Sequence, residues 1–176
     1  RSTAENLDAK GWQVIAGVRK EKAGAALTGA DDRLKPILLD VTKPDQVDAA
    51  VETVRVALGG QKLTGLINNA GIANMGPLAV QPLDQFKAHF DVNVFGLLRA
   101  SQAFAPLLGM DESLAGKPGR IINITSVGGR LASPFLGAYT ATKHAVESMT
   151  DSLRRELVIF GIDAIAVGPG AVKTPI

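Results

Sequence analysis

The sequence contains no cysteine and only two histidines, His89 and His144. Without thiols the chain can form neither a disulfide nor a thiolate metal site, and two histidines argue against a histidine metal centre. No apolar run approaches the roughly 20 residues that span a bilayer, and the N-terminus does not resemble a signal peptide. These absences predict a cytoplasmic protein with no bound metal and no membrane segment.

Charge of one sign is also scarce, because 19 lysines and arginines are nearly balanced by 17 aspartates and glutamates. No basic run stands out, so we expect no nucleic-acid partner. Hydrophobic residues make up 46% of the 176 residues, which is enough to build a core. The length suits a single domain, which we expect to cover residues 1–176.

Short apolar runs alternate with longer segments of helical periodicity along the chain. The expected strands are residues 13–17, 35–39, 65–68, 120–124 and 162–167. The expected helices are residues 46–58, 83–108 and 138–160. The strands are almost continuously apolar, as in a parallel sheet with helices on both faces. The alternation predicts an α/β fold with a doubly wound parallel sheet.

Tyr139 and Lys143 lie four residues apart in an expected helix, so their side chains share one face. A free phenol titrates at about 10 and is a poor acid or base at neutral pH, whereas a neighbouring ammonium favours the phenolate. Ser126, upstream, supplies a hydroxyl that can hold a substrate oxygen beside the phenol. The three groups predict a site that moves a proton on and off that oxygen. The Tyr-x-x-x-Lys spacing alone also occurs by chance on surface helices.

Three further motifs accompany this group. Residues 68–71 (Asn-Asn-Ala-Gly) follow an expected strand, Asn93 lies within an apolar helical stripe, and residues 169–170 (Pro-Gly) follow the last strand. Together and in this order, the motifs closely resemble the short-chain dehydrogenase/reductase family over the whole chain. Residues 126–129, with Pro134 and Phe135, are more weakly similar to the branch that acts on steroids, retinoids and other apolar alcohols.

The resemblance implies a Rossmann-like fold, a nicotinamide cofactor, an alcohol or ketone substrate, and a homodimer or homotetramer. It implies that Tyr139 is the general acid/base, that Ser126 polarises the substrate oxygen, and that Lys143 activates Tyr139 and binds the nicotinamide ribose. Asn93 completes the catalytic set through a proton relay that includes water. From the residues alone, Asn93 must find partners for its amide, and a satisfied core amide is the alternative. We expect His89 at the surface or at an interface.

Cofactor choice depends on the end of the first expected strand, residues 17–20 (Gly-Val-Arg-Lys). An acid there would bind the ribose hydroxyls of NAD, whereas Arg19 suits a 2′-phosphate. We therefore expect NADP(H) rather than NAD(H), the alternative being that Arg19 is a solvated charge. Asp40 and Val41 match the family's adenine contacts, although Asp40 can equally cap a helix near Pro44. The other implied cofactor contacts are Asn69, Ala70, Gly71, Tyr139, Lys143, Pro169, Gly170, Val172 and Thr174, of which Thr174 would hold the carboxamide.

Two other functions fit parts of this pattern. A dehydrogenase-like scaffold could sense a nucleotide or bind a partner without turnover, and an epimerase or dehydratase could also use Tyr-x-x-x-Lys. The complete set of four catalytic residues favours an active oxidoreductase. Residues 131–136, between Ser126 and Tyr139, are mainly apolar and indicate a moderately hydrophobic substrate.

The family begins with a strand and a glycine-rich turn that binds pyrophosphate at a helix N-terminus. Neither occurs here, and the first expected strand matches the family's second. Each buried backbone group left unpaired by a missing central strand would cost about 1–3 kcal/mol. We therefore expect the first strand, the glycine turn and a downstream substrate lid to lie outside this sequence.

Overall fold

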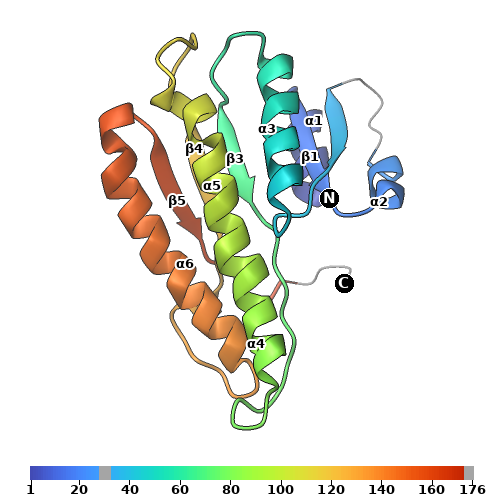
Figure 1. Ribbon diagram of the computed structural model, residues 1–176, viewed down its shortest axis with the longest axis vertical. Helices are drawn as coiled ribbons and strands as arrows, with labels where there is room; N and C mark the ends of the chain where they lie inside the picture. The colour runs from blue at the N-terminus through green and yellow to red at the C-terminus, as the bar shows by residue number, and fades with distance from the viewer. Residues whose placement is uncertain (28–32, 173–176) are drawn as a thin grey trace. The chain divides into compact units, whose positions relative to one another are not determined.

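A computed structural model describes residues 1–27 and 33–172 of the chain (Figure 1). The chain forms two compact units, Arg1–Ala57 and Leu58–Ile176. In both units parallel strands alternate with helices. The α/β class with parallel strands that the sequence predicts is therefore confirmed.

The first unit is built on two parallel strands, β1 (Val14–Val18) and β2 (Leu34–Leu38). Helices α1 (Ser2–Ala9) and α2 (Glu21–Ala25) pack against this pair. Helix α3 (Pro44–Leu58) follows β2, and its buried residues recur at helical spacing: Val47, Ala50 and Val54. Both strands begin within one residue of the predicted positions.

The second unit contains a parallel sheet in the order β3 (Gly65–Asn68), β4 (Arg120–Ile124) and β5 (Asp163–Val167). Figure 1 shows α5 (Leu97–Ala105) and α6 (Gly137–Glu156) side by side over one face of this sheet. Helix α5 packs on β3, and α6 packs on β5. The loops at the carboxyl ends of the strands therefore open toward the N-terminus of α6.

The two faces of this sheet differ in burial. The row Leu66–Ile121–Ala164 faces the helices and joins a core that includes Leu108 and Ile162. The neighbouring row, Ile67, Ile122 and Ile165, points to the other face and is half-buried. On the face that the helices of this unit cover, Ile121 and Ala164 are fully buried and Leu66 is partly buried against the same core.

The helical region predicted at residues 83–108 contains two π-helical turns. It consists of α4 (Leu83–Phe90), a π-helical turn (Asp91–Gly96), α5 and a second π-helical turn (Pro106–Met110). A π turn is wider than an α turn, often occurs at functional sites, and here buries Asn93. The sequence pattern gives the extent of the region correctly but does not reveal the two wide turns.

Each sheet ends at an unpaired strand. Within residues 1–27 and 33–172, β1 pairs only with β2, and β3 pairs only with β4. None of the helices in this part of the chain is both long and apolar enough to cross a bilayer.

Candidate active site

Ser126 stands at the start of a short 3-10 turn, Val127–Gly129, directly after β4. Its Oγ accepts a hydrogen bond from the Gly128 N–H at 3.1 Å, which leaves the hydroxyl hydrogen free to donate. A β-carbon placed at Gly128 would lie 3.5 Å from Ser126 Oγ and 3.4 Å from Tyr139 Cε1. The serine hydroxyl and the tyrosine ring therefore border the same space.

Lys143 lies one turn after Tyr139 on α6 and is only 6% exposed. Its Nζ lies 5.6 Å from the centre of the Tyr139 ring and donates a hydrogen bond to Ile124 O at 2.7 Å. Burial lowers the pKa of the Lys143 ammonium from its ordinary value. The bond to Ile124 O is the one hydrogen bond that Lys143 Nζ makes to the described residues, so two of its N–H groups remain for a ligand.

Asn93 is buried in the π turn, and its amide is fully engaged. Oδ1 accepts from Ile72 N at 2.8 Å, while Nδ2 donates to Ile72 O and to Thr142 Oγ1, both at 3.0 Å. Thr142 Oγ1 in turn donates to Tyr139 O at 2.6 Å. Asn93 thus ties the loop after β3 to the turn of α6 that carries Tyr139. Its role in a proton relay stays a prediction.

The end of β3 meets this group at Gly71. A β-carbon at Gly71 would lie 3.4 Å from Asn93 Oδ1 and 3.9 Å from Lys143 Nζ. Asn69 and Ala70, just before it, are exposed. A glycine beside an ammonium with free N–H groups fits the close approach of a nucleotide.

The segment after β5 also reaches the serine turn. Pro169 O accepts from Val127 N at 3.1 Å, and a β-carbon at Gly170 would lie 4.0 Å from Val127 Cγ1. Val172 is exposed. Thr174, the predicted carboxamide contact, lies outside the described residues.

The cofactor residues predicted in the first unit lie at the ends of β1 and β2. Arg19 is exposed there, while Asp40 and Val41 are half-buried. The pKa of Asp40 is lowered mainly by hydrogen bonds from Thr42 and also by the positive charges of Arg19 and Lys43. The carboxylate accepts from Thr42 N and Oγ1 at 2.9 and 2.7 Å instead of capping α3.

The predicted surface or interface position of His89 is wrong. It is fully buried on α4 rather than at a surface. Its Nδ1 donates to Gln85 O at 2.8 Å, and its Nε2 accepts from Asn74 N at 2.9 Å. The loop after β3 returns over α4 and covers the ring, a contact that helical periodicity alone cannot reveal.

The sequence matches the short chain dehydrogenase family over residues 1–176. The chain belongs to this family. It is 36% identical to the NADPH-dependent 3-dehydrocapnine reductase of Ornithobacterium rhinotracheale, over 100% of this chain and 62% of the relative. It is 38% identical to human retinol dehydrogenase 16, over 98% of this chain and 53% of the relative. The chain therefore spans little more than half the length of these curated relatives.

Solved structures of the family share the fold. A gluconate 5-dehydrogenase from Burkholderia cenocepacia, in complex with NADP and tartrate, has a TM-score of 0.81 and 31% identity, over 92% of this chain and 62% of the other. A 3-ketoacyl-(acyl-carrier-protein) reductase from Brucella melitensis, complexed with NADH, has a TM-score of 0.87 and 28% identity, over 96% of this chain and 68% of the other. These matches confirm the predicted family and its Rossmann-like fold.

Four buried polar side chains, which the sequence did not predict, form a row of hydrogen bonds that we call the buried polar chain. Asn68 Nδ2 donates to Ser101 Oγ and to Asn123 Oδ1, and Asn123 Nδ2 donates to Thr150 Oγ1, each at 2.9 Å. It links α5, β3, β4 and α6. The adjacent hydroxyl of Thr125 is buried without a partner in the described residues and lies near the backbone of Gly168.

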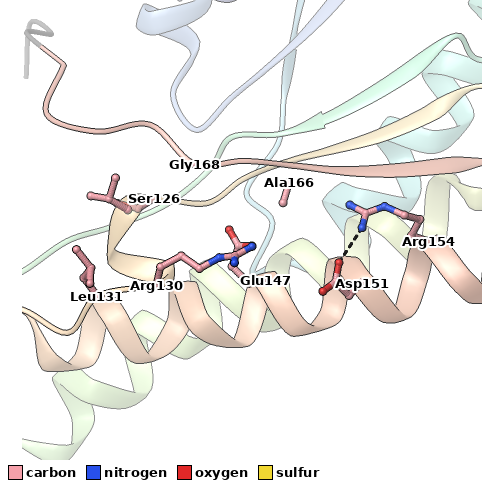
Figure 2. A pocket seen from close by; sticks show the side chains of 9 residues that line it. Ser126, Arg130, Leu131, Glu147, Asp151, Arg154, Ala166 and Gly168 are labelled. Atoms are coloured by element: carbon pink, nitrogen blue, oxygen red, sulfur yellow. Dashed lines mark hydrogen bonds and ion pairs between the residues drawn. The ribbon is translucent and has the colours of Figure 1, made fainter.

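Figure 2 shows a pocket of about 420 Å³ between α6 and β5. Ser126 lines one end of it, but Tyr139 and Lys143 do not line it. Two ion pairs form its charged walls: Arg130–Glu147 at 3.2 Å and Arg154–Asp151 at 2.8 Å. Because each arginine is paired, the pocket offers no net charge to an anion, and of Ser126, Tyr139 and Lys143 it meets Ser126 alone.

Proposed function

We propose that the protein is an NADP(H)-dependent oxidoreductase that acts on an alcohol or ketone, with Tyr139 as general acid/base. One observation carries this proposal. The Ser126 hydroxyl, the Tyr139 ring and the buried Lys143 ammonium gather around a single turn at the carboxyl end of the sheet. In open α/β sheets this is the end at which ligands bind.

When bound, a nicotinamide cofactor supplies or accepts the hydride. Ser126 donates its free hydroxyl hydrogen to the substrate oxygen and holds it beside the phenol. Tyr139 gives its proton to that oxygen in reduction and removes it in oxidation. The positive charge of Lys143 favours the phenolate that remains after the proton leaves. Asn93 holds the loop and α6 together and completes the proposed catalytic set.

The proposed cofactor contacts come from three places. Two of the Lys143 N–H groups are available for ribose hydroxyls, and Gly71 admits the cofactor beside them. Arg19 supplies a guanidinium for a 2′-phosphate, which favours NADP(H) over NAD(H). The remaining proposed contacts are Asp40, Val41, Asn69, Ala70, Tyr139, Pro169, Gly170, Val172 and Thr174.

The loops near the reacting groups support an apolar substrate. Residues 72–83 and 131–142 contain no charged side chain. Met75, Leu78, Leu131 and Phe135 are exposed, and the Gly76 N–H donates to Phe135 O at 2.8 Å and joins the two loops. Phe135 has a φ of 64°, a strained conformation for a bulky residue. We propose a moderately hydrophobic alcohol or ketone.

Consumption of NADPH by the purified full-length protein tests this function, with steroid, retinoid, acyl and sugar carbonyls compared. We expect turnover with the apolar carbonyls, loss of turnover in Ser126→Ala, and no change in the matched control Ser2→Ala, which removes an exposed hydroxyl from α1. Binding of NADPH without turnover of any carbonyl would instead support the nucleotide-sensing alternative. Absence of NADPH binding would overturn both.

We further propose a homodimer or homotetramer built on the helical regions 83–108 and 138–160. Phe95 is 51% exposed in the first region, and the small side chain of Ser148 is exposed in the second. Light scattering of the full-length protein tests the assembly, and a clean monomer at micromolar concentration would contradict it. The cytoplasmic location stays a prediction.

A further inference from the structure

The hydrogen bonds of His89 define one protonation state. Gln85 O can only accept, so Nδ1 carries a hydrogen. The Asn74 N–H can only donate, so Nε2 carries a lone pair. The buried ring is therefore a neutral imidazole with its proton on Nδ1.

His89 and Asn93 hold the same segment of chain. They lie four residues apart, where side chains share one side of a helix. Asn93 makes two hydrogen bonds to the backbone of Ile72, and His89 accepts one from the backbone of Asn74. Three hydrogen bonds thus fix residues 72–74 on the α4 region.

This fixed segment begins at the reacting groups. Gly71, directly before Ile72, lies beside both Asn93 Oδ1 and Lys143 Nζ. Displacement of residues 72–74 would therefore move Gly71 relative to the ammonium. Small displacements of this kind weaken binding because several contacts must form at once.

We propose that His89 is a positioning residue that fixes residues 71–74 where they border the nicotinamide cofactor. Its consequence for catalysis rests on the proposed function. His89 touches none of the reacting groups and acts through the Asn74 N–H, which a smaller or apolar side chain would leave without its partner. Asn93 by itself fixes only Ile72, so residues 71–74 are held by both side chains. We call His89 and Asn93 together the clamp.

Amide hydrogen exchange on the full-length protein without cofactor tests the clamp directly. In His89→Leu, exchange at Asn74 should accelerate by roughly tenfold or more, the effect of losing one hydrogen bond. His89→Gln, whose side-chain oxygen can accept the same N–H, should restore most of the protection. His144→Leu, a matched substitution of the exposed histidine on α6, should leave Asn74 unchanged. Unchanged protection of Asn74 in His89→Leu would overturn the proposal.

If His89→Leu does not fold, the imidazole nitrogen NMR signals of the wild-type protein decide. A neutral ring protonated on Nδ1 supports the clamp. A charged ring, or one protonated on Nε2, would overturn it because neither can accept from Asn74.

NADPH affinity and turnover separate positioning from general stability. His89→Leu should weaken NADPH binding roughly tenfold, as expected for one lost hydrogen bond, while turnover at saturating NADPH changes far less. Partial recovery in His89→Gln supports the proposal, and equal losses in both variants would overturn it. If the wild type shows the expected exchange pattern but binds no NADPH, the proposed function fails while the clamp stands.

Discussion

The two compact units hold their proposed functional residues in opposite ways. In residues 58–172, Asn93 and Lys143 are buried and held by hydrogen bonds to backbone atoms. In residues 1–57, Arg19 is exposed at the end of a strand. Proton transfer requires atoms fixed within hydrogen-bond reach, whereas phosphate recognition requires a flexible cation of the right sign. The difference predicts strict intolerance to substitution in the second unit and graded effects in the first.

The largest effect is expected for Tyr139→Phe, which removes the exchangeable proton and keeps the ring. Turnover should fall by about 10²–10⁴-fold, the usual contribution of general acid–base catalysis. NADPH binding should persist because Lys143 and Gly71 are unchanged. Steady-state kinetics and cofactor titration measure both, and near-normal turnover would remove Tyr139 from the mechanism.

The next effect concerns the buried polar chain. Asn123→Ala removes the partner of Asn68 and Thr150 and should lower the free energy of unfolding by about 2–3 kcal/mol. Gln102→Ala, which removes an exposed amide from α5, is the control and should change stability little. Denaturant unfolding of the full-length variants measures the difference. Equal stability of the two variants would show that the buried hydrogen bonds of Asn123 do not stabilise the fold.

A smaller effect is expected in the first unit. Arg19→Ala should lower kcat/KM with NADPH roughly tenfold, as for one charge-assisted hydrogen bond, and should leave kcat/KM with NADH nearly unchanged. Lys22→Ala, a nearby exposed cation, is the matched control. A wild-type preference for NADH would mean that Arg19 does not meet the 2′-phosphate, and the proposed cofactor choice would be wrong.

The smallest effect is a pH dependence that originates in Lys143. Because burial lowers its folded-state pKa below the ordinary value of 10.5, the unfolded chain holds this proton more tightly. Unfolding therefore takes up a proton between the lowered pKa and 10.5, and the free energy of unfolding contributed by Lys143 rises with pH in that window. Unfolding experiments at several alkaline pH values should show this rise in the wild type relative to Lys143→Met. Lys87→Met, at an exposed site, should behave like the wild type, and a fall with pH would contradict the argument.

The sequence predicts those elements whose burial repeats with a regular period. The strands and α3 were predicted closely, because apolar residues mark them. Helix α1 buries no residue and therefore leaves no periodic signal. The winding change at Asn93 is also invisible, because a π turn keeps the composition of an ordinary helix.

The candidate site likewise contains residues that a sequence pattern locates and residues that it does not. Ser126, Tyr139 and Lys143 lie near one another because their spacing and the strand order determine their neighbourhood, and their catalytic roles stay predictions. His89 was misplaced because its burial depends on a loop that lies 15 residues earlier in the chain. The hydrophobic periodicity of α4 shows which face of the helix is apolar. It does not show that the loop containing Asn74 covers the polar His89 ring.

The Asn68–Asn123 pair also determines how the strands can align as the protein folds. The apolar residues on β3 and β4 resemble one another, so hydrophobicity alone would accept an alignment shifted by two residues. Such a shift would place Asn68 opposite Ile121 and leave its buried amide without Asn123 as a partner. A shift by one residue would turn the amide to the wrong face. The two amides can form their hydrogen bond in only one alignment. They therefore select the native register of two strands that lie far apart in the sequence.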